Sequence, residues 1–178
     1  MASALYRYFP SRDALLTALI VDAYRDLRDA AAAVPADRPR AQWLAVWRAV
    51  RAWALAHPAE FGLLYGTPVP GYTAPPETVE PAAAVLLQLA GIVRAHGTPP
   101  AGGAPLPGAV RADLRALIEQ QPEGMPEEQL ELVMLAWTQL FGAVGFEVFG
   151  RLNDLVLARA EYFDRHAELA ADLVGLPR

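Results

Sequence analysis

Cysteine and lysine are both missing from this chain of 178 residues. Without cysteine the chain has no disulfide framework, no thiolate nucleophile and no thiolate metal site. All 15 basic residues are arginines, and together with the many alanine, proline and glycine residues this is typical of GC-rich coding. The arginine bias therefore describes the genome more than a mechanism.

Long apolar runs are missing as well. Arg, Asp, Glu or Gln interrupts each apolar stretch well before about 18 residues, so we expect no transmembrane span. No charged-then-apolar leader opens the sequence, so we expect the protein in the cytoplasm. With 54% hydrophobic and 20% charged residues, the composition predicts one or two folded domains with a substantial core.

Motifs that carry enzyme chemistry are also absent. The three histidines, His57, His96 and His166, share no close spacing with one another or with a carboxylate pair, so they indicate no metal site. The sequence contains no G-x-S-x-G, no glycine-rich phosphate loop and no H-E-x-x-H. Acidic pairs such as Glu127 and Glu128 are typical of a solvated helix start. We therefore expect neither an enzyme nor a cofactor or metal.

Strand patterns are not found, and the apolar spacing is helical throughout. Ser11 is a candidate N-cap with Asp13 in the first turn, Pro58 starts a short helix, and Asp154 is a candidate cap of the last helix. Proline-rich or glycine-rich segments separate the helices at 67–77 and 97–108. The sequence thus predicts an all-α fold with about seven helices, near residues 11–33, 40–57, 58–66, 77–96, 108–121, 126–150 and 154–174, and a very short one at 2–8.

Charge is unevenly distributed along the chain, whose net charge is −5. Residues 109–178 carry six arginines against twelve acids, whereas residues 1–28 carry four against three, and residues 1–12 are purely basic. A polyanion is therefore expected to meet the protein at its amino end.

The last two long helices are apolar on more than one side, which indicates burial on more than one side. A central position in a monomeric bundle and a homodimer formed by residues 126–174 both explain this. Gly142, Gly145 and Gly150 lower helix propensity, which makes sense if another backbone or a ligand approaches closely. Of the two, we expect the homodimer.

Aromatic residues concentrate near the centres of several helices. They are either plain core or the lining of an apolar pocket, because both use the same residue types. We expect a small hydrophobic or aromatic ligand with few polar anchors. The candidate ligand-binding residues are Trp47, Phe61, Tyr65, Leu86, Trp137 and Phe141.

The stretch ALYRYFPSRDALLTAL, residues 4–19, resembles the end of the helix-turn-helix of the TetR family of bacterial transcriptional regulators. The match comprises Leu5, Tyr6, Tyr8, Phe9, Ser11, Arg12, Asp13 and Leu15, and it departs at Ala4, where Thr or Ser is common. Residues 52–68 and 136–150 are similar to segments of TetR-type C-terminal domains. From the residues alone, the stretch indicates a short amphipathic N-terminus that packs on the body.

The resemblance implies a TetR-like helical bundle with a recognition-helix remnant and connecting helix in residues 1–34. Residues 35–178 would be the ligand-binding and dimerisation domain. The candidate DNA-binding residues are Tyr6, Arg7 and Tyr8, with Arg12 placed for a phosphate. The resemblance implies a homodimeric repressor whose ligand controls binding to operator DNA. A stand-alone ligand-binding or dimerisation module and a helical-bundle enzyme are the alternatives.

The family's helix-turn-helix has two helices before this one, and the sequence given lacks them. Three explanations are open: a misassigned start codon, a natural truncation or an engineered truncation. The chain as given is expected to bind duplex DNA poorly and without sequence preference, because a lone two-turn helix is too short to be stable in water. A chain extended by the two helices is expected to bind a palindromic operator.

Overall fold

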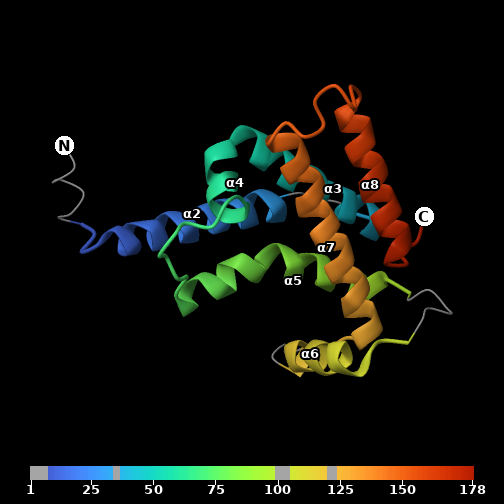
Figure 1. Ribbon diagram of the computed structural model, residues 1–178. Helices are drawn as coiled ribbons and strands as arrows, with labels where there is room; N and C mark the ends of the chain where they lie inside the picture. Colours follow the sequence, from blue (N-terminus) through green and yellow to red (C-terminus); the bar gives the residue numbers. More distant parts are fainter. Residues whose placement is uncertain (1–7, 34–36, 99–104, 120–123) are drawn as a thin grey trace.

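Seven α-helices and one 3-10 turn make up this computed structural model, which describes residues 8–33, 37–98, 105–119 and 124–178 (Figure 1). No strand occurs in those ranges, so the predicted all-α class is confirmed. Residues 2–7 of the predicted short N-terminal helix lie outside the described ranges. The helices are α2 (Arg12–Ala32), α3 (Pro39–Ala56), α4 (Pro58–Tyr65), α5 (Val79–His96), α6 (Gly108–Glu119), α7 (Glu127–Val148) and α8 (Arg159–Leu173), with the 3-10 turn η1 (Pro76–Thr78) before α5.

Local sequence signals account for the starts of α2, α3 and α4. Ser11 is extended (φ −152°) and its hydroxyl accepts a hydrogen bond of 3.1 Å from the backbone N–H of Ala14, which confirms the predicted N-cap. Asp13 in the first turn stabilises the positive end of the helix dipole. Pro39 and Pro58 occupy first helical positions, where their missing N–H costs no hydrogen bond.

The prediction that Asp154 caps the last helix is wrong, because α8 begins at Arg159 after the N-cap Ala158. Asp154 instead has φ +63° in the turns between α7 and α8. Those turns start at Gly150, whose φ of +71° ends α7. The N–H of Arg151 donates to Phe146 O (2.7 Å) and that of Gly150 to Glu147 O (3.1 Å), the two bonds of a Schellman motif. Leu155 and Leu157, in the same turns, are 76% and 87% exposed.

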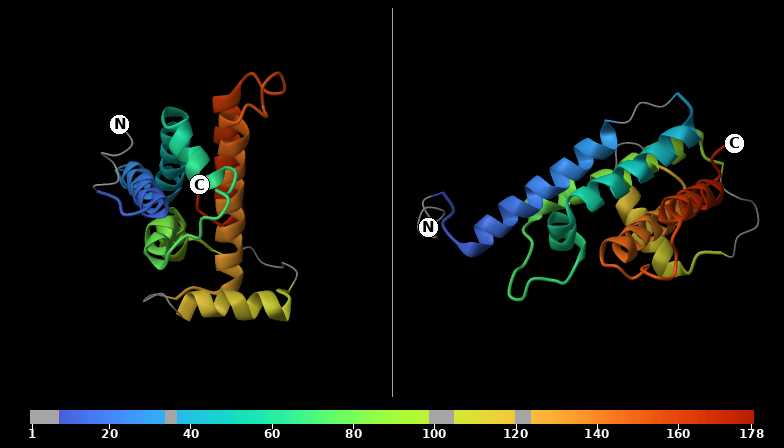
Figure 2. Two further views of the ribbon diagram at one scale, coloured as in Figure 1. Left: turned by 60° about the vertical axis from the view of Figure 1, so that its left-hand side comes forward. Right: turned by 90° about the horizontal axis from the view of Figure 1, so that it is seen from above.

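The core lies between α2, α3, α5, α7 and α8. Trp43 and Trp47 of α3 are fully buried in it, and the indole N–H of Trp43 donates to Ala167 O of α8 at 3.1 Å. Figures 1 and 2 show α7 and α8 side by side along one flank of the bundle, with α6 crossing one end of α7. Both figures also show the amino-terminal part of α2 extending beyond the other helices.

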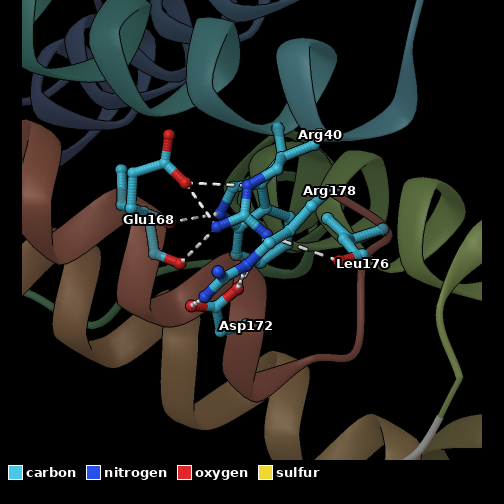
Figure 3. Close-up of polar contacts among 7 residues, drawn as sticks. Arg40, Glu168, Asp172, Leu176 and Arg178 are labelled. Carbon is cyan, nitrogen blue, oxygen red and sulfur yellow. Dashed lines mark hydrogen bonds and ion pairs between the residues drawn. The ribbon is translucent and has the colours of Figure 1, made fainter.

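Arg40, near the start of α3, holds the end of α8 and the residues that follow it (Figure 3). Its guanidinium pairs with Glu168 and, at 2.8 Å, with Asp172, and it donates to Leu176 O at 3.4 Å. Arg178 also forms an ion pair with the Asp172 carboxylate, at 3.0 Å. The carboxyl-terminal segment is thereby fastened to the amino-terminal end of α3.

Two helical segments, Pro76–His96 and Glu127–Val148, are long and apolar enough by length and composition alone to cross a membrane. In this fold the two helices pack against each other, and each contributes some buried residues to the core. Val93 and Val133, one from each, are fully buried.

Candidate functional site

Two of the four residues proposed for DNA contact, Tyr8 and Arg12, are described, and they lie just before and at the start of α2. Tyr8 is 83% exposed, and Arg12 is exposed as the first residue of the helix. Tyr6 and Arg7 lie outside the described residues. The accessible positions of Tyr8 and Arg12 suit contact with a phosphate backbone, and the DNA-binding roles of all four residues stay predictions.

Four of the six candidate ligand-binding residues form one aromatic cluster. The ring of Phe141 lies 4.2 Å from that of Tyr65 and 5.6 Å from that of Trp137, measured between centroids. The ring of Phe61 lies 5.2 Å from that of Tyr65, tilted by 36°. The cluster joins α4 to α7, and the role of its residues in ligand binding stays a prediction.

Tyr24 and Phe149 extend this cluster, and sequence reasoning missed both. Tyr24 meets Tyr65 edge-on at 6.1 Å, and Phe149 lies 5.9 Å from Phe61. Tyr24 shares α2 with Arg12, twelve residues upstream, which is roughly 18 Å along the helix axis. The cluster therefore contacts the helix that carries the candidate phosphate anchor. The helical spacing of Tyr24 placed it on the apolar face of α2 without indicating its aromatic partner.

The polar atoms of the cluster are largely desolvated. Burial raises the pKa of the Tyr65 hydroxyl far above its ordinary value. Burial also raises the pKa of Tyr24. The indole N–H of Trp137 is buried and has no hydrogen-bond partner among the described residues. A buried donor without a partner can donate a hydrogen bond to an acceptor that comes within reach.

Trp47 and Leu86, the other two candidates, lie elsewhere in the core. Trp47 is fully buried, with Trp43 at 5.9 Å and Phe163 at 5.8 Å between ring centroids. Leu86 is half-buried on α5 and packs against the same core. The structure thus brings Phe61, Tyr65, Trp137 and Phe141 together, whereas the ring of Trp47 packs on Trp43 and Phe163 instead.

A second feature is the outer face of α7 and α8, which carries a row of exposed apolar side chains. Leu135 and Phe146 of α7 are 52% and 59% exposed, and Tyr162 and Leu169 of α8 are 41% and 44% exposed. Gly142 lies in the same row of α7, and a Cβ added there would meet no heavy atom within 4 Å. Nothing in the described protomer requires a glycine at this position.

A cavity of about 330 Å³ opens between these two helices. Its lining includes Gly142, Phe146, Arg159, Tyr162 and His166, and none of the six candidate ligand-binding residues. The Nε of Arg159 and the Nδ1 of His166 are buried and have no hydrogen-bond partner among the described residues. Within the same ranges, no group of three or more His, Cys, Asp or Glu residues is placed to hold a metal ion.

The other two glycines, Gly145 within α7 and Gly150 just after its end, have close neighbours in the described chain. Gly150 supplies the positive φ of the Schellman motif described above. A Cβ on Gly145 would lie 3.9 Å from the rings of Phe61 and Phe149, so this glycine sits against the aromatic cluster. Gly142 alone among the three faces open space.

Comparison with known proteins gives consistent matches over most of the chain. A family model described as "Tetracyclin repressor-like, C-terminal domain" matches residues 43–170. The HTH-type transcriptional regulators Mb1846 of Mycobacterium bovis and Rv1816 of Mycobacterium tuberculosis are each 36% identical over 182 aligned positions, which cover 95% of this chain and 76% of each relative.

Two solved structures share the fold. The crystal structure of regulatory protein SCO4313 is 33% identical, with a TM-score of 0.77 over 97% of this chain and 79% of that one. A protein of unknown function from Rhodococcus sp. RHA1 is 22% identical, with a TM-score of 0.57 over 93% of this chain and 72% of that one.

Proposed function

Because the chain belongs to the TetR family of transcriptional regulators, we propose that it acts as a homodimeric repressor controlled by a small ligand. Its C-terminal domain, residues 35–178, would bind a small apolar or amphipathic molecule, and residues 1–34 would belong to the DNA-binding part. Such a regulator would act in the cytoplasm, where it would bind duplex operator DNA.

The contact between Tyr24 and Tyr65 carries this proposal. A ligand that inserts beside Tyr65 and Phe141 must displace at least one of these closely stacked rings, since interiors are close-packed. Tyr24 packs edge-on against Tyr65, so the displacement acts directly on α2. As a continuous helix of 21 residues, α2 carries a small rotation at Tyr24 to Arg12 at its far end.

Ligand binding would thereby change the separation of the two DNA-binding ends in a dimer. Two recognition helices fit successive major grooves only when they lie about one helical turn of DNA apart, roughly 34 Å. A ligand that binds more tightly to the arrangement in which the recognition helices are not about 34 Å apart would release the operator. The ligand site and the DNA-binding ends would then be coupled through two alternative conformations of the dimer.

The exposed row on α7 and α8 supports the dimer. Leu135, Phe146, Tyr162 and Leu169 are each 41–59% exposed, and neighbouring apolar side chains left in water are typical of an interaction surface. Gly142 gives a partner helix room to approach the backbone of α7 closely. An interface of this obligate kind buries about 2,000 Å² or more.

Sedimentation tests the dimer. Replacing Leu169 with Glu would place a charge against apolar surface in the interface, so Leu169→Glu should sediment as a monomer at micromolar concentration. Leu19→Glu is the matched control, because Leu19 is 48% exposed on α2, a helix that contacts neither α7 nor α8. Phe163 is unsuitable for the test, since it is 3% exposed and belongs to the protomer core. A wild-type chain that sediments as a monomer would contradict the dimer.

Ligand coupling is tested with Tyr24→Leu, which keeps apolar volume but removes the edge-on ring contact. Hydrophobic dyes that bind the wild type should raise its melting temperature by mass action. In a chain that also carries the family's two preceding helices, the same dyes should weaken operator binding. Tyr24→Leu should keep dye binding and lose most of the effect on DNA; an unchanged effect would refute α2 as the link.

A further inference from the structure

Two contacts on one face of α2 come from one continuous stretch of chain, residues 65–72. Tyr65, the last residue of α4, meets the ring of Tyr24 edge-on at 6.1 Å. The hydroxyl groups of Tyr72 and Thr17 are hydrogen-bonded at 2.9 Å. Thr17 and Tyr24 are seven residues apart, so they lie on the same face of α2, roughly 10 Å apart along its axis. The stretch therefore holds α2 at two points, which together fix the direction of the helix.

Thr17 lies where α2 leaves the body of the protein. It is the first buried residue of the helix, at 8% exposed, whereas residues 12–16, the free arm, are half-buried or exposed. Figures 1 and 2 show the amino-terminal part of α2 beyond the other helices. A buried hydroxyl needs a hydrogen-bond partner, and Tyr72 supplies one. The contact between Thr17 and Tyr72 thus marks the boundary between the packed part of α2 and its free arm.

The segment that carries Tyr72 has a restricted backbone. Residues 66–75, which we call the strap, run from the end of α4 past α2 towards η1 (Figure 1). The N–H of Tyr72 donates to Val69 O at 3.2 Å. Between these two residues lie Pro70 and Gly71, and the φ of +77° at Gly71 is that of a type II turn. The strap contains three prolines, each with a fixed φ, so Tyr72 is presented to α2 on a stiff support.

We propose that the contact between Thr17 and Tyr72 is the pivot on which α2 turns when the ring of Tyr65 moves. The inference rests on the proposed function, because it specifies how a change at the aromatic cluster reaches the DNA-binding end. Arg12 lies five residues before the pivot and Tyr24 seven residues after it, roughly 7.5 and 10 Å along the helix axis. A displacement of Tyr24 therefore moves Arg12 in the opposite direction, by about three quarters of the distance. Both α3 and α5 also pack on α2, so the movement is a small tilt.

The experiment uses the absence of cysteine, which makes every introduced cysteine a unique labelling site. Asp13→Cys places a spin label on the free arm, and Ala52→Cys places one at an exposed position of α3. A second pair, Asp13→Cys with Glu131→Cys of α7, measures the arm from another direction. Electron paramagnetic resonance gives the distance between the two labels. An excess of unlabelled chain ensures that both labels belong to one protomer.

Two substitutions of Tyr65 move the driven end of α2 without any ligand. Tyr65→Trp presses a larger ring against Tyr24, whereas Tyr65→Leu withdraws the ring. The two variants should shift the mean distance of at least one label pair in opposite directions, and the distance distribution should stay narrow. Absence of a shift in both variants would overturn the inference.

Removal of the pivot provides the second test. Tyr72→Phe keeps the ring and Thr17→Val keeps the volume, but each removes the hydrogen bond. Either variant should broaden the distance distribution and lose most of the shift caused by Tyr65→Trp, and the double variant should add nothing further. Thr73→Val, at an exposed threonine of the strap, is the matched control and should leave the shift unchanged. A shift of full size in Tyr72→Phe or Thr17→Val would show that the hydrogen bond only stabilises the strap, and would overturn the pivot.

Sedimentation of the same samples separates this inference from the proposed function. A dimer in which Tyr72→Phe leaves the shift intact refutes the pivot and leaves the regulator unaffected. A monomer that shows the shift, and loses it in Tyr72→Phe, refutes the proposed dimer and supports the pivot.

Discussion

Gly175 is the position where one added methyl group should harm the fold most clearly. It follows α8 with φ +74°, a conformation that costs a residue with a Cβ about 1–2 kcal/mol. A Cβ built there would lie 1.8 Å from Thr98 O, a backbone atom that cannot rotate away. Gly175→Ala must therefore push apart the two segments that meet at this point, 97–98 and 174–176.

Three contributions set the size of the effect. Besides the backbone cost, separation breaks the hydrogen bond of 3.0 Å from Thr98 N–H to Gly175 O, which contributes about 1 kcal/mol. It also exposes part of Leu176, now 4% exposed, whose full burial contributes about 1.5–3 kcal/mol. We expect Gly175→Ala to lower the free energy of unfolding by about 3–6 kcal/mol and the melting temperature by roughly 10 °C or more.

Thermal and urea unfolding followed by circular dichroism measure this loss, at equal protein concentrations so that association does not bias the comparison. Gly91→Ala is the matched control, because a Cβ at this position inside α5 would meet no heavy atom within 4 Å. It should stabilise the protein by about 0.5–1 kcal/mol, since alanine favours a helix over glycine. A melting temperature of Gly175→Ala within about one degree of wild type would refute the reasoning.

Three further predictions concern charged residues. Arg51→Met should lower the free energy of unfolding by about 3 kcal/mol in a urea titration, because it leaves Glu147, whose side chain is 7% exposed, as an unpaired buried carboxylate; adding Glu147→Met should recover much of that loss. Arg178 and then Arg40 hold the pKa of Asp172 below its ordinary value of 3.8, so its stabilising effect is complete above that pH and lost as the pH falls through the lowered pKa. The melting temperature of Asp172→Asn should therefore be below that of wild type at pH 7, with a gap that closes at acid pH; a gap independent of pH would contradict this. In a chain that carries the family's two preceding helices, Arg12→Ala should weaken binding to specific and scrambled DNA alike and flatten the salt dependence, whereas a change in operator preference would show a base contact instead.

The helices follow from short-range information, which is why the sequence predicted them well. The cap at Ser11, the prolines at 39 and 58 and the apolar repeat of 3.6 residues all act within one or two turns of backbone. Where two local signals competed, the prediction was wrong: Asp154 resembled a cap, yet the turn that begins at Gly150 continues through it. The family was also readable locally, from the motif around Arg12.

Partnerships between helices depended on the tertiary structure. Periodicity states which side of a helix is apolar, but it does not state which neighbour covers that side. For this reason Tyr24 was missed as a member of the aromatic cluster, and Trp47 was expected there although its ring packs on Trp43 and Phe163. The same holds for Arg159 and His166, which in sequence are ordinary surface residues. Only the packing of α7 against α8 buries their polar atoms without partners, because burial is a property of the space between helices and not of either helix alone.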